Sequence, residues 1–140
     1  MELRKYINIF LIGIIGSIIL ILSEFFSWFS DYSLIEIYVI TTSVAIEDSF
    51  LFLFPLLSGI ICLIASTLVI YKIELKVKSV IIFFIGLGFL LMFFIEYITQ
   101  EFEYISNAGI GFYFGLLGFL LIIINIINVL ITIEKRTDGN

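Results

Sequence analysis

The sequence predicts an all-α membrane protein whose single domain, residues 1–140, is a bundle of four transmembrane helices. Of its 140 residues, 62% are hydrophobic and only 14% are charged, whereas about 25% is usual for a soluble domain. So few polar residues cannot cover the surface of a soluble fold. Four long uncharged runs alternate with short segments that hold the charges, and about 20 apolar residues are enough to cross a bilayer core of about 30 Å.

Each uncharged run is expected to be a helix, because backbone polar groups in lipid must be hydrogen-bonded within the segment. The first run passes Glu24 and continues to Phe29, and Pro55 is expected to kink the second. We place the spans at about 6–29, 49–71, 79–98 and 108–133, with outer loops at about 30–48 and 99–107 and an inner loop at about 72–78.

The first run has a second interpretation, as a cleaved secretory signal. Arg4 and Lys5 precede it as in the basic start of a signal peptide. No small-residue cleavage motif follows the run, so we expect it to be retained as a span.

The basic residues predict the orientation of the bundle. Basic residues concentrate in cytoplasmic loops, and all seven lie before the first span, between the second and third, or after the fourth. Four acids lie on this inner side and eight on the outer side. The sequence therefore predicts cytoplasmic N- and C-termini in the plasma membrane. The seven are Arg4, Lys5, Lys72, Lys76, Lys78, Lys135 and Arg136.

The same asymmetry disfavours a small multidrug transporter. Proteins of that family also have four short spans with a carboxylate in the first one. They insert in both orientations and show little basic asymmetry, whereas this chain has a strong one.

The composition also limits the chemistry. With no His and a single Cys, Cys62, the chain lacks the usual ligands of zinc and haem and the usual nucleophile–base pairs. We therefore predict no catalytic residues, no metal site and no cofactor. The remaining enzymatic alternative is a lipid-modifying site that uses outer carboxylates with Mg²⁺.

Two carboxylates are predicted at the outer membrane edge. Glu24 precedes Trp28 by four residues, so both would share a helix face, and Glu96 ends the third span. Carboxylates at such depth are functional candidates that bind a cation or share a proton. The alternative is that both reach the headgroup region and are hydrated.

The first outer loop is rich in β-branched and aromatic residues around Glu36 and Tyr38. This composition favours one or two short strands, which can pair as a β-hairpin. The exposed edge of such a strand would bind another chain. The competing prediction is a short helix lying in the membrane interface.

Small residues indicate where helices pack closely in lipid. Gly111, Gly115 and Gly118 line one face of the fourth span, either for a partner or for packing inside the bundle. We expect Asn125 to form an interhelical hydrogen bond and Cys62 to be a packing residue.

The arrangement resembles claudin-type four-span proteins. In that family a tryptophan follows the first span, as in Ser27-Trp28-Phe29. The resemblance implies a role in cell contacts or as an auxiliary subunit. The chain departs from the family's pattern in its short loop, in its lack of a second tryptophan and of paired loop cysteines, and in having no basic residue at the outer edge of span two.

We thus predict a non-enzymatic membrane protein that acts by association, as an accessory subunit or a self-associating surface protein. Its expected partners are membrane lipids and other membrane subunits or further copies of itself, with no nucleic acid. The alternative is a small transporter or ion-conducting bundle that uses Glu24 and Glu96.

Overall fold

The fold is mostly helical. A computed structural model describes residues 2–29, 31–71, 76–100 and 109–138. Two short strands and a 3₁₀ turn, η1, complete it. The elements are α1 (Glu2–Ser23), β1 (Ser27–Phe29), β2 (Tyr32–Ser33), α2 (Leu34–Thr42), α3 (Ile46–Ser49), η1 (Phe50–Leu53), α4 (Phe54–Tyr71), α5 (Lys76–Gln100) and α6 (Ile110–Asp138).

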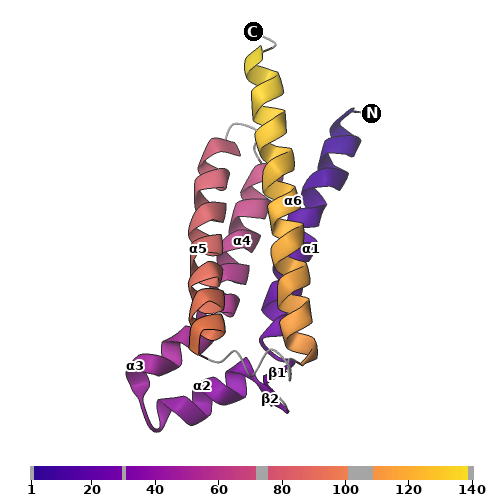
Figure 1. Ribbon diagram of the computed structural model, residues 1–140. Coiled ribbons are helices and arrows are strands. Elements are labelled where there is room, and N and C mark those ends of the chain that lie inside the picture. The colour runs from indigo at the N-terminus through magenta and orange to yellow at the C-terminus, as the bar shows by residue number, and fades with distance from the viewer. Residues whose placement is uncertain (1, 30, 72–75, 101–108, 139–140) are drawn as a thin grey trace.

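The long helices α1, α4, α5 and α6 run side by side (Figure 1). Within the described residues, Ile46–Tyr71, Lys76–Glu96 and Ile110–Thr132 are long and apolar enough to cross a membrane, and Phe10–Ser23 is a shorter apolar helix. The predicted mostly helical class of fold is therefore confirmed, and the three long apolar helices are compatible with membrane spans. The start of α1 and the end of α6 lie at one end of the bundle (Figure 1), and the strands, α2 and α3 lie at the other, here called the hairpin end.

Small residues bring three pairs of helices close together. Helix α1 packs against both α6 and α4, and α4 packs against α5. A Cβ atom added to Gly118 of α6 would lie 2.8 Å from the carbonyl oxygen of Gly16 on α1. At Gly86 of α5 it would lie 2.8 Å from the Sγ atom of Cys62 on α4. Cys62 is therefore a buried packing residue, as predicted.

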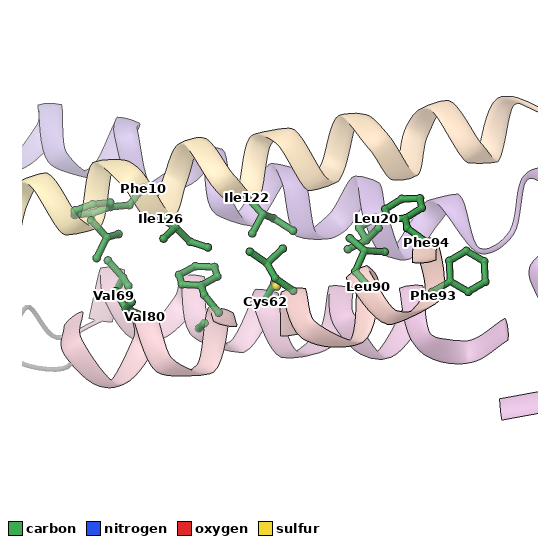
Figure 2. Close-up of a cluster of buried hydrophobic side chains, with 14 of the residues drawn as sticks. Phe10, Leu20, Cys62, Val69, Val80, Leu90, Phe93, Phe94, Ile122 and Ile126 are labelled. Carbon is green, nitrogen blue, oxygen red and sulfur yellow. The ribbon is translucent and has the colours of Figure 1, made fainter. Parts of the chain in front are cut away.

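Large side chains fill the space that the backbones leave. Figure 2 shows side chains of α1 and α6 meeting those of α4 and α5 along the bundle axis. Between α5 and α6, the ring of Phe94 contacts the rings of Phe112 and Phe119 at centroid distances of 6.2 and 6.0 Å. The core includes Phe10, Leu20, Cys62, Val69, Val80, Leu90, Phe93, Ile122 and Ile126.

The outer surface of the long helices is apolar as well. Exposed aliphatic and aromatic residues occur on every long helix, which is the pattern of helices in contact with lipid rather than with water. Examples are Ile15 and Leu22 on α1, Ile64 on α4, Phe84 and Ile85 on α5, and Leu120 and Ile127 on α6.

The first helix is shorter at its C-terminus than predicted. The amide groups of Glu24, Phe25 and Phe26 donate to carbonyls three residues back, which tightens the last turn. The chain then leaves the helix and enters β1. The expected continuation to residue 29 is therefore wrong, and Glu24 and Trp28 do not share a helix face.

A two-stranded hairpin is present, but it is short and lies earlier in the chain than predicted. Strands β1 and β2 are antiparallel, with Ser27 opposite Ser33. The segment Leu34–Thr42 is helical, so the strand expectation for it is wrong. A capping box starts this helix: the Ser33 amide donates to Glu36 Oε2 at 3.1 Å, and the Glu36 amide donates to Ser33 Oγ at 3.3 Å. This local pairing outweighs the β-propensity of the segment.

Pro55 is the second residue of α4, and α4 directly follows η1. In the first turn of a helix the missing N–H group removes no helical hydrogen bond. The proline thus stands at the start of α4, and not inside it as the kink prediction required.

Two predicted loops lie wholly or partly outside the described part of the chain. The undescribed residues are 101–108, around the predicted second outer loop, and 72–75 in the inner loop.

Candidate functional site

The most unusual side chain of the described fold is Glu24. Glu24 follows α1 directly, and the residue is 0% exposed. Within the described structure, neither Oε1 nor Oε2 has a hydrogen-bond partner. A buried polar group without a partner costs free energy, and an ionised carboxylate costs far more than a neutral one. The burial therefore favours a neutral, protonated carboxyl group or one that holds a bound cation.

The backbone around Glu24 folds back on itself. Its amide donates to the carbonyl of Ile21 at 3.2 Å, and its carbonyl accepts from the amide of Ile35 at 3.4 Å. The second bond ties the start of α2 to the end of α1. The described part of residues 25–34, which includes the hairpin, therefore returns to Glu24, and we call this segment the Trp28 loop. Leu34 at its far end is also fully buried.

Trp28 anchors this loop in the bundle. Its residue is 0% exposed, and its Nε1 donates to the carbonyl oxygen of Ser23 at 2.6 Å. The ring meets Phe93 of α5 edge-on at 5.4 Å and Phe112 of α6 edge-on at 5.8 Å between centroids. One indole thus joins the end of α1, β1, α5 and α6.

The glycines at the start of α6 make room for that indole. A Cβ atom at Gly115 would lie 2.7 Å from Cη2 of Trp28, and one at Gly111 would also collide with the ring. The amide of Gly109 donates to the carbonyl of Trp28 at 3.0 Å. Gly111 and Gly115 are thus used within the chain against Trp28, and Gly118 is used against Gly16 of α1.

The other predicted site residues lie at the same end. Glu96 is half-buried on α5, three residues after Phe93, so α5 and the Trp28 loop bring both predicted carboxylates to the hairpin end. Glu36 is exposed and caps α2, and Tyr38 is half-buried on α2.

The segment formed by α2 and the turn after it, residues 34–45, crosses the hairpin end of the bundle (Figure 1). We call it the α2 arm. It presents the exposed apolar side chains of Val39, Ile40 and Val44, the last being 85% exposed. These residues precede the apolar helical stretch that begins at Ile46. The arm is thus an apolar surface next to the acidic Asp31 and Glu36, both of which are exposed.

A second polar group lies deep inside the bundle. Asn125 of α6 is 0% exposed, and neither its Nδ2 nor its Oδ1 has a partner within the described chain. A Cβ atom at Gly13 of α1 would lie 2.7 Å both from Asn125 Cγ and from Ser66 Oγ of α4. The expected interhelical hydrogen bond of Asn125 is therefore not formed, although the amide lies where three helices meet.

The described residues contain no cluster of three or more His, Cys, Asp or Glu side chains that could hold a metal ion. Comparison with protein-family models, curated proteins and solved structures finds no match to this chain. The geometry of the hairpin end is therefore the basis for the functional proposal.

Proposed function

We propose that this protein is a four-span integral membrane protein with both termini in the cytoplasm, and that it acts by association rather than by catalysis. It would serve as an accessory subunit of a membrane complex or as a self-associating surface protein. The observation that carries this proposal is the exposed apolar surface of the α2 arm. The claudin-like arrangement of spans supports it at the level of architecture.

The apolar side chains of the α2 arm are left exposed by the part of the chain that the structure describes. Lipid covers apolar side chains along the spans, but Val39, Ile40 and Val44 belong to a segment across the end of the bundle. Contiguous exposed apolar groups of this kind mark interaction surfaces. The outer loops, at about 30–48 and 99–107, contain six acids and no Lys or Arg, so the fitting partner surface is apolar with basic residues around it.

Site-directed crosslinking tests the association. Cys62 is the single cysteine of the chain and is buried, so Val44→Cys adds a uniquely accessible thiol. A maleimide–photoreactive crosslinker at this position should give one defined adduct in native membranes, either with a second copy or with another membrane protein.

The matched control is Lys78→Cys, an exposed position near the start of α5 at the opposite end of the bundle. It should not give that adduct. The absence of any protein adduct at position 44, together with a monomer after mild-detergent purification, would contradict the proposal.

A second candidate function is favoured by the burial of Glu24. A carboxyl without a partner inside a membrane bundle is typical of proton and ion pathways. In this alternative the protein is a small transporter or ion-conducting bundle that uses Glu24 and Glu96. Flux in reconstituted vesicles that is abolished by Glu24→Gln or Glu96→Gln, and retained in the exposed control Glu47→Gln, would support it. Equal flux in all three variants would exclude it.

A further inference from the structure

We propose that Glu24 is a proton-binding site, in which a neutral carboxylic acid is enclosed at the hairpin end by the Trp28 loop. The ligand is a proton rather than a metal ion or a basic side chain. This inference concerns the state of one carboxyl group, so it holds whether the protein acts by association or conducts ions.

A basic side chain cannot neutralise Glu24. The sequence contains no Lys or Arg between residues 6 and 71 or between 79 and 134. The described Lys76 lies at the far end of α1, where its Nζ sits 5.4 Å from the centroid of the Phe10 ring. Phe10 and Glu24 are about 20 Å apart along the helix axis at 1.5 Å per residue. Among the described residues, Glu24 therefore has no basic partner of the kind that commonly stabilises a buried carboxylate.

A metal ion also fits the Glu24 site poorly. Ca²⁺ takes six to eight oxygen ligands and Mg²⁺ about six. The described chain offers no group of three potential metal-binding side chains, and the Glu24 carbonyl already accepts a hydrogen bond from Ile35. A proton is the one cation that a single carboxyl group holds without further ligands.

The neighbouring elements favour the neutral acid further. The titratable side chains described on the elements that meet at the hairpin end are acids and tyrosines, and negative charges nearby disfavour a second one. They are Asp31 and Tyr32 in the hairpin, Glu36 and Tyr38 on α2, Glu47 and Asp48 on α3, Glu96 on α5 and Tyr113 on α6.

The Trp28 loop begins directly after Glu24, and the indole holds it against the bundle. The indole donates to Ser23, the residue directly before Glu24, and its ring is held by Phe93 and Phe112. In this proposal, opening of the loop exposes the buried Glu24 carboxyl to water. Trp28→Phe keeps a six-membered aromatic ring but removes the indole N–H and the pyrrole part of the ring, so the loop should open more often in this variant.

Modification by dicyclohexylcarbodiimide tests the proposal. This apolar reagent reacts with a protonated carboxyl: the acid proton moves to a carbodiimide nitrogen and the carboxylate oxygen bonds to the central carbon. The adduct rearranges to a stable N-acylurea with no leaving group. The protein therefore gains the mass of one reagent molecule, and peptide mass spectrometry locates it.

At neutral pH in native membranes, we expect modification at the buried Glu24 and not at Glu36 or Glu47, whose side chains are exposed. Glu24→Gln should lose the adduct, and Trp28→Phe should gain it several-fold faster. An unmodified Glu24 in both the natural chain and Trp28→Phe would overturn the proposal, as would equal modification of Glu24 and Glu47. The readout is a mass on one residue, so it is independent of crosslinking and of flux.

Discussion

The indole nitrogen of Trp28 donates a 2.6 Å hydrogen bond to the backbone carbonyl oxygen of Ser23, the last residue of α1. This bond turns the chain back at the point where a longer apolar helix is expected. It also places the ring against Gly111 and Gly115 of α6. A single side chain thereby joins the end of α1 to the start of α6.

Replacement of Trp28 tests this joint. Trp28→Ala leaves a cavity between α5 and α6 and should lower the free energy of unfolding by about 3–5 kcal/mol. Trp28→Phe loses the hydrogen bond and part of the ring and should cost about 1–2 kcal/mol. Unfolding by denaturing detergent in mixed micelles measures both. The exposed Phe25→Ala is the control, and a loss as large in this control would contradict the role of Trp28.

The glycines of the bundle should differ sharply in their tolerance of a methyl group. Gly118→Ala places a Cβ atom 2.8 Å from the carbonyl oxygen of Gly16, so α1 and α6 must separate. We expect a loss of about 1–3 kcal/mol in unfolding free energy. Gly88 has nothing within 4 Å of its Cβ position.

Gly88→Ala is therefore the matched control in the same assay. It should leave stability unchanged or raise it by up to about 1 kcal/mol, because alanine is the better helix former. Equal losses at both glycines would show that α1 and α6 do not pack as described.

The buried amide of Asn125 should be dispensable for folding. Both of its polar atoms lack partners in the described chain, so Asn125→Leu removes a desolvation cost at similar volume. We expect the unfolding free energy to stay the same or to rise by about 1–2 kcal/mol. A decrease of that size in the detergent unfolding assay would instead show that a bound water or another ligand satisfies the amide. The exposed Ile124→Leu serves as the control for this helix.

Cysteine labelling in intact cells tests the proposed orientation. Val44→Cys at the hairpin end should react with a membrane-impermeant maleimide from outside, because basic residues concentrate on the cytoplasmic side. Lys78→Cys should react only after the membrane is permeabilised. The natural chain, whose Cys62 is buried, should stay unlabelled in both conditions, and the reverse pattern for the two variants would invert the topology.

Several features of the hairpin end could be predicted from local sequence and others could not. The hairpin and the importance of Glu24 follow from residue types near one another in the chain. The α2 helix was within reach too, since Ser33 and Glu36 have the spacing of a capping box. That spacing competes with a β-prone composition, and composition alone favours the wrong structure.

The residue at which α1 ends could not be predicted from local sequence. The apolar run continues through Phe25, Phe26 and Phe29, so hydropathy indicates a helix. The helix ends at Ser23 because the indole N–H of Trp28 donates to the Ser23 carbonyl. The indole ring then packs in a pocket formed by residues of α5 and α6. The residues that make this pocket, such as Phe93 and Gly115, are more than sixty positions away.

The sequence by itself determined the apolar, helical class of this protein and the sorting of its charges, because these properties depend on composition and on position along the chain. Only the tertiary structure decided that Trp28 is an internal joint, that Gly111 and Gly115 receive its ring, and that Glu24 is enclosed without a partner. These facts depend on which distant segments meet, and hydropathy is the same for a side chain that faces lipid as for one that faces another helix.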